Sequence, residues 1–400
     1  MDNKEKLLDR YQFKAGYVHN YEDFKDKIYN KTIIPYQVEF QPPPKSIKKI
    51  CWLECPYCYG LSADDSAGDR MLKERAMKIM RQIADGGVKK VIFAGYATDP
   101  LNCPFLPDLL EIAIDSQMIF GFNTKALKVT PRLLELLARP DIQPGSYMSL
   151  SVDAGSNEIY NIFHGVETNP KIYDKVLANT KKIAEASREG GSLFDISAAY
   201  LINIHNSEIS EVSNFIDDFK GAGCNILRFT FPQPPRAIPQ KPGVIPTVDE
   251  KLLYKETLIP IIEARSSDNC SVMMVDADSE HDIFQKPRTT PCFARFIYPT
   301  VGYDGWLYHC SQSSSPNFRL MALGDLNTED FWNVFYNYDS NDFGKYLTDC
   351  SKKMEQTGCR CDRKMHVTNT SVINSKVFEG SINSKVFEGS INSKVFEGLI

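Results

Sequence analysis

The amino-acid sequence predicts an α/β fold, a (βα)6 partial TIM barrel followed by a small α+β domain. From residue 36 to residue 231, short stretches rich in β-branched and aromatic residues alternate with helical stretches. This alternation is typical of a parallel sheet with crossover helices. Six such pairs are fewer than the eight of a closed barrel, so an open one is expected. Prolines and a second group of cysteines follow and indicate a separate domain.

The barrel elements are expected in alternating order. The first helix, residues 71–84, repeats apolar residues on one face and ends at Gly86-Gly87. Thr130 and Pro131 supply the N-cap and first-turn proline of the third helix, which ends before Pro140. The expected strands are residues 36–40, 90–94, 118–122, 147–153, 195–202 and 226–231, and the other expected helices are residues 105–117, 171–188 and 209–221.

The segments around the barrel differ from it in composition. Six prolines in residues 232–246 predict a stiff connector. Thr247, with Glu250 three residues on, predicts a capped helix reaching about residue 267 that Pro260 kinks or splits. We therefore expect five segments: an N-terminal extension (1–35), the barrel (36–231), the connector (232–246), the small domain (247–366) and a tail (367–400).

The tail contains a nine-residue repeat. Ile-Asn-Ser-Lys-Val-Phe-Glu-Gly occupies residues 373–380, 382–389 and 391–398. Three copies of so short a unit do not build a solenoid, so we expect a disordered appendage. The alternative is a substrate-like peptide or a docking repeat for a partner.

Charge and hydropathy exclude several classes of partner. Lys and Arg total 46 against 51 Asp and Glu, a net charge of −5, which gives no general attraction to nucleic acid or anionic membrane. No run of about 18 apolar residues occurs, and the first residues lack the apolar core of a signal peptide. We expect a cytoplasmic protein without nucleic-acid or membrane partners.

Three cysteines lie within eight residues near the start of the barrel. Cys51, Cys55 and Cys58 have the spacing C-x3-C-x2-C, and three thiolates on one short loop can bind three corners of a 4Fe–4S cubane. The fourth iron would then carry no protein ligand and would be open to chemistry. A structural zinc site is the alternative, but such sites usually pair their cysteines as knuckles from two loops. Buried cysteines brought together by chance are a second alternative.

This loop, with Tyr57 before its last cysteine, resembles the signature C-x3-C-x-(aromatic)-C of the radical S-adenosylmethionine (radical SAM) enzymes. The resemblance implies a (βα)6 partial barrel whose site lies at the carboxyl ends of the strands. It implies that the open iron chelates S-adenosylmethionine, and that one electron cleaves this cofactor to a 5'-deoxyadenosyl radical, which abstracts a hydrogen atom from the substrate. An electron donor such as flavodoxin or ferredoxin is an implied partner.

The same resemblance indicates a cofactor-binding segment after strand two. Ala97, Thr98 and Asp99 occupy the place of a Gly-Gly-Glu segment that holds the ammonium group of S-adenosylmethionine. Asp99 keeps a charge-assisted acceptor there, and Tyr57 is also expected among the cofactor-binding residues. An ordinary Asp-Pro turn is the alternative.

Strands four and five supply the remaining expected cofactor contacts. Ser149 and Ser151 point to the same side of strand four, and either could reach the ribose or the methionine carboxylate. Asn203 and Asn206 resemble the polar positions near the ribose and adenine. No catalytic acid or base can be chosen among the histidines, and His164 is expected to be solvated in a loop.

A second group of cysteines lies in the C-terminal third. Cys292 and Cys310 have the spacing C-x12-G-x4-C, and Asp304-Gly305 predicts a hairpin turn between strands near residues 296–298 and 306–309. This hairpin resembles the opening of the SPASM and twitch extensions, which ligate an auxiliary 4Fe–4S cluster. The segment 324–327 and the helix containing Trp332 resemble the element that follows.

The later cysteines depart from the seven-cysteine SPASM pattern. After Cys310 only Cys350, Cys359 and Cys361 remain in this region, and five cysteines cannot fully ligate two cubanes. One auxiliary cluster held by Cys292, Cys310, Cys359 and Cys361 is therefore expected, with Cys350 as a competing ligand. Two clusters with an open iron, or a zinc ion, are the alternatives.

The expected function is that of a radical SAM enzyme with an auxiliary cluster. The C-terminal extension resembles that of enzymes acting on peptides or protein side chains, so a peptide substrate is preferred. The alternative is a small-molecule substrate such as a sugar, nucleoside or aminocyclitol. A non-catalytic iron–sulfur carrier or binding protein is the alternative from another class. The lone Cys103, Cys224 and Cys270 are expected to pack in the core.

Overall fold

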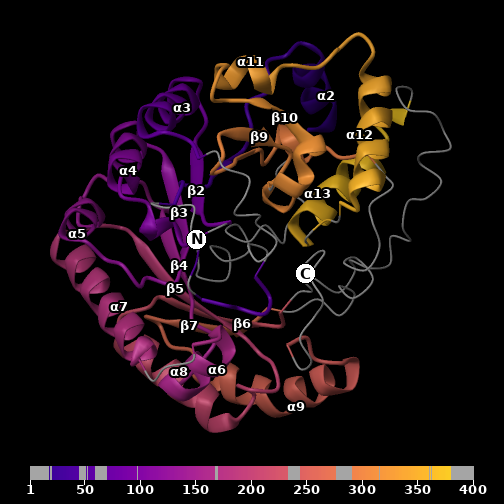
Figure 1. The fold of residues 1–400 in the computed structure, drawn as a ribbon. Coiled ribbons are helices and arrows are strands. Elements are labelled where there is room, and N and C mark those ends of the chain that lie inside the picture. The colour runs from indigo at the N-terminus through magenta and orange to yellow at the C-terminus, as the bar shows by residue number, and fades with distance from the viewer. Residues whose placement is uncertain are drawn as a thin grey trace. The chain divides into compact units, whose positions relative to one another are not determined.

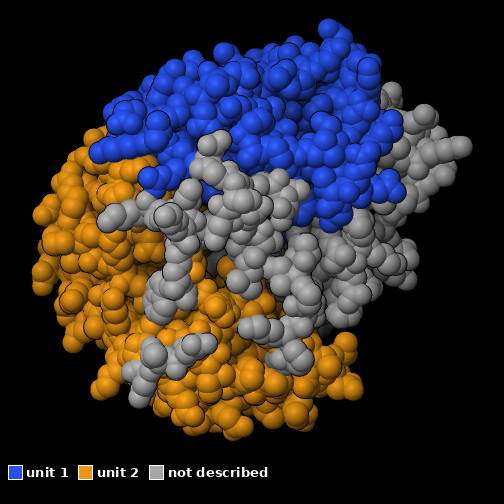
Figure 2. Space-filling model, viewed as in Figure 1, with its two compact units in different colours: residues 1–41, 66–91, 277–400 blue, residues 42–65, 92–276 orange. Residues whose placement is uncertain are grey.

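A computed structural model describes residues 18, 20–44, 51, 53–58, 70–96, 98–166, 170–232, 244–275, 291–314, 316–359, 361 and 363–379. The chain forms two compact units (Figure 2). Residues 1–41, 66–91 and 277–400 form one, here called the terminal unit; residues 42–65 and 92–276 form the other, the sheet unit. Most of the predicted connector lies outside the described residues.

The sheet unit contains a parallel sheet in which a helix follows each strand from β2 to β6. Its strands lie in the order β2-β3-β4-β5-β6-β7, and the pairs from β3 to β7 are parallel. Helices α4, α5, α7 and α8 run along one side of these strands (Figure 1). The bounds are β2 Lys90–Ala94, α4 Leu106–Asp115, β3 Ile119–Thr124, α5 Pro131–Leu137, β4 Tyr147–Ser151, α6 Asn157–His164, α7 Ile172–Glu189, β5 Asp195–Leu201, α8 Ile209–Gly221, β6 Ile226–Thr230, α9 Val248–Ala264 and β7 Ser271–Met274.

These elements confirm the predicted α/β class. Strand β2 and helix α8 have the predicted bounds, and Thr130 caps α5 by accepting from Leu133 N. Thr247 and Glu250 form the predicted capping box, although α9 continues through Pro260 as one helix. Helix α6 and strand β7 are additional. Because β7 pairs with β6, residues 248–274 belong to the sheet unit, whereas the sequence placed them in the small domain.

Apolar residues on both faces of the strands position the sheet. Strand β2 is buried along its whole length, as expected for a parallel sheet covered by helices. Phe122 stacks on Phe93 of the neighbouring strand, and Tyr200 of β5 packs against Phe229 of β6. Together with the parallel pairing of β3, β4 and β5, this packing places the carboxyl ends of β2 to β6 side by side.

The terminal unit combines the two ends of the described chain. Its strands lie in the order β10-β9-β8-β1, with β1 parallel to β8 and β8 antiparallel to β9. The bounds are α2 Tyr21–Tyr29, β1 Val38–Phe40, α3 Lys73–Asp85, β8 Thr300–Val301, β9 Trp306–Tyr308, β10 Ala322–Asp325, α11 Phe331–Phe335, α12 Phe343–Thr357 and α13 Arg363–Asn374.

The predicted hairpin exists, but its first strand was misplaced. Strand β8 begins at Thr300, while Phe296 ends a 3-10 turn. The reason is that Phe296 packs edge-on against Phe335 and Tyr338, so an aromatic cluster and not a strand holds this segment. The turn at Gly305 is as predicted, with a φ of 79°. Asn327 closes the turn by donating to the Asp304 carbonyl at 2.9 Å.

Part of the predicted disordered tail is folded. Residues 367–374 continue helix α13, and Phe378 of the first repeat is 1% exposed. The Phe378 ring lies 4.9 Å from Phe293 and 5.5 Å from Phe343, centroid to centroid. The first copy of the repeat therefore packs in the terminal unit, and the other two copies lie outside the described residues.

No helix in the described ranges is long and apolar enough to span a bilayer.

Candidate metal and cofactor site

The loop that carries Cys51, Cys55 and Cys58 is fastened to the carboxyl ends of β3 and β4 within the sheet unit. Glu54 N donates to the His164 carbonyl at 2.9 Å, and a turn joins Cys58 N to the Cys55 carbonyl at 3.0 Å. The Tyr57 hydroxyl donates to Asp153 Oδ2 at 2.6 Å. Tyr57 also stacks on Phe163 with ring centroids 5.1 Å apart. The loop is thus held at the edge of the sheet where parallel-sheet sites lie.

Asp153 is the centre of the polar contacts. It follows β4, is fully buried and has a φ of 61°, a left-handed conformation that few residues other than glycine adopt. Its Oδ1 accepts from Leu201 N at the end of β5, and its carbonyl accepts from Asn206 Nδ2, both at 2.9 Å. These bonds hold the strained backbone, and such strain concentrates at functional sites.

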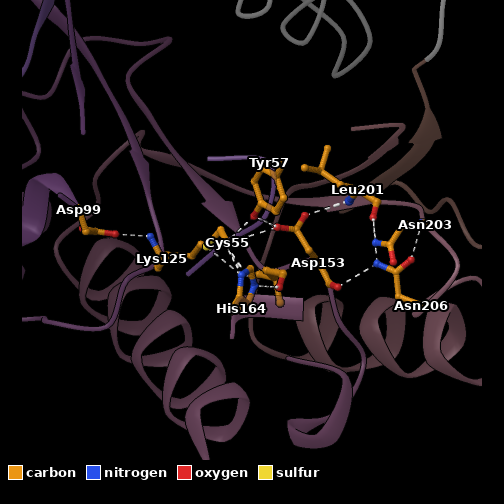
Figure 3. Close-up of polar contacts among 10 residues, drawn as sticks. Cys55, Tyr57, Asp99, Lys125, Asp153, His164, Leu201, Asn203 and Asn206 are labelled. Atoms are coloured by element: carbon orange, nitrogen blue, oxygen red, sulfur yellow. Dashed lines mark hydrogen bonds and ion pairs between the residues drawn. The ribbon is translucent and has the colours of Figure 1, made fainter. Parts of the chain in front are cut away.

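Lys125 brings a positive charge to the same place. It directly follows β3, and its Nζ lies 3.0 Å from the Tyr57 hydroxyl and 3.4 Å from Asp153 Oδ2. Its Nζ is also 3.2 Å from His164 Nε2. Figure 3 shows Tyr57, Lys125 and His164 directed toward Asp153. The buried carboxylate is thereby paired with a cation that is 12% exposed.

His164 lies beside the second cysteine of the loop. It is the last residue of α6, which ends at Gly165 with a φ of 66°, and it is fully buried. The expectation of a solvated loop histidine was therefore wrong, because α6 turns the ring inward. Its Nε2 lies 3.0 Å from the Val152 carbonyl, and its Nδ1 lies 3.1 Å from Cys55 Sγ.

The Val152 carbonyl only accepts, so we assign the hydrogen of His164 to Nε2. Nδ1 is then the acceptor, and it lies 3.1 Å from Cys55 Sγ and 3.4 Å from Lys125 Nζ. Burial, with the nearby Lys125 charge, holds the pKa of His164 well below its usual value. The ring is consequently neutral in the metal-free chain.

The three loop cysteines have the chemistry of cluster ligands. All eleven cysteines lie among the described residues, and none of them forms a disulfide there. Cysteine thiolates are the ligands of 4Fe–4S clusters. Burial raises the pKa of Cys55 to about 12; the Lys125 charge opposes this shift, and negative charge on Cys58 and Cys51 adds to it. The three sulfurs therefore influence one another, and a cationic cluster would supply the charge that their joint ionisation requires. Within the described ranges no three His, Cys, Asp or Glu side chains are gathered closely enough to hold a metal ion.

The residues predicted to bind the cofactor lie at the same edge of the sheet, and the side chains of two of them already accept hydrogen bonds within the chain. The half-buried Asp99 accepts from Leu101 N at 2.9 Å and from the Thr124 hydroxyl at 2.8 Å, and burial raises its pKa. Thr98 accepts from Asn102 Nδ2 at 3.0 Å. Donors within the chain thus occupy both side chains, and Ala97 lies outside the described residues.

The two serines lie in β4 and the asparagine lies just after β5, as expected. Ser149 is buried in β4, and Ser151 is half-buried at its end. Asn203 is fully buried, and its side chain donates to the Leu201 carbonyl and accepts from His205 N, both at 2.9 Å. Their cofactor roles stay predictions.

The contacts of Lys125, Asp153 and His164 were not foreseen. Lys125 directly follows β3 and Asp153 lies two residues after β4, and this position at the end of a strand was the available signal. His164 gave no such signal, because its burial depends on α6, a helix that was not predicted from the sequence.

The predicted auxiliary ligands are buried in the terminal unit. Cys292, Cys310, Cys359 and Cys361 are each at most 8% exposed, and Cys350 is 4% exposed. Asn369 Nδ2 lies 3.8 Å from Cys292 Sγ and 3.9 Å from Cys361 Sγ. Cys350 Sγ lies 4.0 Å from Nε2 of His309, the neighbour of Cys310. A set of buried thiols fits an iron–sulfur cluster in its donor chemistry.

Residues 46–197 match the family model of the radical SAM superfamily. The PqqA peptide cyclase of Granulibacter bethesdensis is 25% identical over 171 residues, which are 42% of this chain and 42% of that protein. The probable GTP 3',8-cyclase of Methanosarcina mazei is 28% identical over 188 residues, 44% of this chain and 50% of that protein. The chain thus spans half or less of these curated relatives.

A solved structure extends the similarity to the fold. SuiB of Streptococcus suis bound to precursor peptide SuiA has a TM-score of 0.54 at 16% identity, covering 86% of this chain and 79% of SuiB. SuiB bound to S-adenosylmethionine has a TM-score of 0.55 at 16% identity, covering 78% and 68%. At such identity the likeness is one of fold.

Proposed function

Since this chain belongs to the radical SAM superfamily through residues 46–197, we propose that it reductively cleaves S-adenosylmethionine and abstracts a hydrogen atom from a peptide. Cys51, Cys55 and Cys58 would hold the cluster. A 4Fe–4S cluster supplies an electron and an open iron for the cofactor. The observation that carries the proposal is the attachment of the cysteine loop to the ends of β3 and β4 through Tyr57, Lys125 and Asp153.

The surrounding residues would orient the loop and exclude water. Tyr57 of the loop stacks on Phe163, and the fully buried Tyr160 packs against His164 with ring centroids 4.2 Å apart. A radical survives only where water and stray side chains are kept away. The interlocked backbone of Asp153, Leu201 and Asn206 gives the site a rigid base.

One auxiliary cluster in the terminal unit is part of the proposal. Its ligands would be Cys292, Cys310, Cys359 and Cys361, whose burial favours a cluster shielded from solvent. A flavodoxin or ferredoxin would deliver electrons to the chain.

A peptide substrate is supported by two similarities. The PqqA peptide cyclase is named for a peptide, and SuiB was solved with a precursor peptide. The similarity to a probable GTP 3',8-cyclase favours a nucleotide as the second candidate.

Cofactor cleavage is the first test. The chain is purified and reconstituted without oxygen, reduced with dithionite in the presence of S-adenosylmethionine, and assayed for 5'-deoxyadenosine by mass spectrometry. We expect about eight irons, as two cubanes, and formation of 5'-deoxyadenosine. Cys51→Ala, Cys55→Ala and Cys58→Ala should each abolish it, whereas Cys270→Ala, which removes a buried thiol outside both cysteine groups, should not. Iron without 5'-deoxyadenosine would instead support an electron carrier.

The substrate class needs a separate test. Peptides translated from short reading frames beside the gene are synthesised with deuterium at carbon, and GTP deuterated on its ribose serves as the rival probe. Deuterium in 5'-deoxyadenosine identifies the donor of the hydrogen atom. Transfer from GTP, with none from any peptide, would contradict the peptide proposal while leaving the radical chemistry intact.

A further inference from the structure

Asn369 lies in α13, beyond the last cysteine of the chain, and is fully buried. We infer that Asn369 is a positioning residue for the auxiliary cluster, donating hydrogen bonds to the sulfurs of Cys292 and Cys361. This inference rests on the auxiliary cluster of the proposed function. It adds a residue that is not itself a ligand and that the sequence placed in a disordered tail.

The orientation of the Asn369 amide follows from its other partner. Phe293 N lies 2.6 Å from Asn369 Oδ1. A backbone N–H only donates, so the atom facing it must be the oxygen, and the NH2 group must point away from it. That NH2 group lies 3.8 Å from Cys292 Sγ and 3.9 Å from Cys361 Sγ. Two N–H donors thus face two sulfur acceptors.

One nitrogen near both sulfurs brings together ligands that are far apart in sequence. Cys292 opens the hairpin segment, and Cys361 is the last cysteine. Asn369 is also bonded to Phe293, the residue after Cys292, so it holds the backbone as well as the sulfur of that ligand. The amide therefore sets the spacing between the first and last expected ligands.

The first repeat reinforces this arrangement. The Phe293 ring lies 4.9 Å from the Phe378 ring, which is buried against Phe24 and Phe343 as well. Phe293 and Asn369 are both 0% exposed, so water does not compete with the hydrogen bond between them. A hydrogen bond in such a low-dielectric place is stronger than one in water.

Hydrogen bonds to ligand sulfurs have a measurable electronic effect. They stabilise the more negative, reduced cluster, and they are among the features that set its reduction potential. Loss of the two N–H donors should therefore make the midpoint potential of the auxiliary cluster more negative. A residue that only packs beside the cluster would not shift it in this way.

The experiment uses the full chain with Cys51, Cys55 and Cys58 all changed to Ala, so that only the auxiliary cluster remains. Asn369→Asp keeps the acceptor for Phe293 N and removes both donors, and Asn369→Leu removes every polar atom. Asn374→Asp, an exposed change on the same helix, is the control. Midpoint potentials come from redox titration followed by EPR. We expect a lower midpoint potential in both Asn369 variants and no shift of the midpoint potential in the control.

A second measurement needs no substitution at Asn369. In the parent chain labelled with 15N-asparagine, pulsed EPR of the reduced auxiliary cluster should detect a 15N coupling. Unshifted potentials with iron retained, or absence of this coupling, would overturn the role of Asn369. Absence of iron from the triple-cysteine variant would instead refute the auxiliary cluster itself, and cofactor cleavage at the first cluster would remain testable separately.

Discussion

The hydroxyl of Tyr57 donates to Oδ2 of Asp153 at 2.6 Å, and this bond joins the cysteine loop to the end of β4. Burial, together with the Asp153 charge, raises the pKa of Tyr57 well above its usual value, so the hydroxyl stays protonated and remains a donor. The bond links the loop to a carboxylate that already holds β5. Loop position and sheet geometry are therefore coupled.

Tyr57→Phe removes this hydroxyl and leaves Asp153 Oδ2 with the longer Lys125 contact. Loss of a partner for a buried charged acceptor should lower the free energy of unfolding by about 1–3 kcal/mol. Urea unfolding of the metal-free chain measures it. Tyr254→Phe, which removes the hydroxyl of a half-buried tyrosine on α9, is the control. Equal stability of the two variants would contradict the role given to the Tyr57 hydroxyl.

Asp153→Ala removes the carboxylate and leaves the Lys125 ammonium and Leu201 N without this acceptor. Breaking a buried ion pair in this way costs about 3–5 kcal/mol, and alanine is poorly suited to a φ of 61°. Asp153→Asn tolerates that backbone and keeps Oδ1, so its loss should be clearly smaller. Thermal unfolding compares the two, and the reverse order would refute the account of Asp153.

His164→Phe keeps the ring volume and removes both nitrogens. The Val152 carbonyl loses its donor and Cys55 loses its neighbour, so we expect weaker retention of iron at the three-cysteine loop. Iron loss to a chelator under anaerobic conditions measures it. His205→Phe, a change at an exposed residue in the loop after β5, is the comparison. Identical rates for the two variants would argue against a role for His164.

Gly86→Ala tests the packing of α3 against α11 inside the terminal unit. An added Cβ would lie 2.1 Å from the Trp332 ring, whose Nε1 donates to the Gln82 carbonyl. Overpacking should cost about 1–3 kcal/mol. Gly221→Ala, where no atom lies within 4 Å of the new Cβ, should be neutral or stabilising by about 0.5–1 kcal/mol. A neutral Gly86→Ala would contradict the contact with Trp332.

The buried hydroxyl of Tyr173 should make the free energy of unfolding decrease at alkaline pH. Burial and a 2.7 Å bond to Asp218 Oδ2 raise its pKa in the folded chain, whereas an unfolded tyrosine titrates near about 10. The folded state thus keeps a proton that the unfolded state loses, so this contribution is complete below about pH 10 and declines above it. Tyr173→Phe should flatten the loss of stability between about pH 9 and 11, measured by urea unfolding. An unchanged slope would be evidence against it.

The sequence was most informative where local pattern decides structure. Strand β2 and helix α8 have their predicted bounds, because apolar periodicity and glycine stops are local signals. The first hairpin strand was misplaced because the Phe296 ring packs in an aromatic cluster formed by residues 335–346, which prevents this segment from pairing as a strand. No local pattern contains that information.

The same distinction applies to the candidate site. The spacing of three cysteines within eight residues was enough to identify the loop as a candidate cluster site. The roles of these cysteines as ligands remain predictions. The partners of the loop come from β3, β4 and α6, more than 60 residues along the chain. Asn369 was assigned to the tail because the repeat that follows it has low complexity. Its burial depends on contacts with Phe293, 76 residues away.

The packing of Phe24 on Phe378, with the bond between Tyr21 and Ser371, has a consequence for biosynthesis. The terminal unit needs α2 near the start of the described chain and α13 near its end, so it cannot close while the ribosome still holds residues 363–379. The sheet unit, complete by residue 276, can fold during translation. Iron would then enter the auxiliary thiols only after synthesis has reached the first repeat, whereas the loop of Cys51 to Cys58 becomes available earlier.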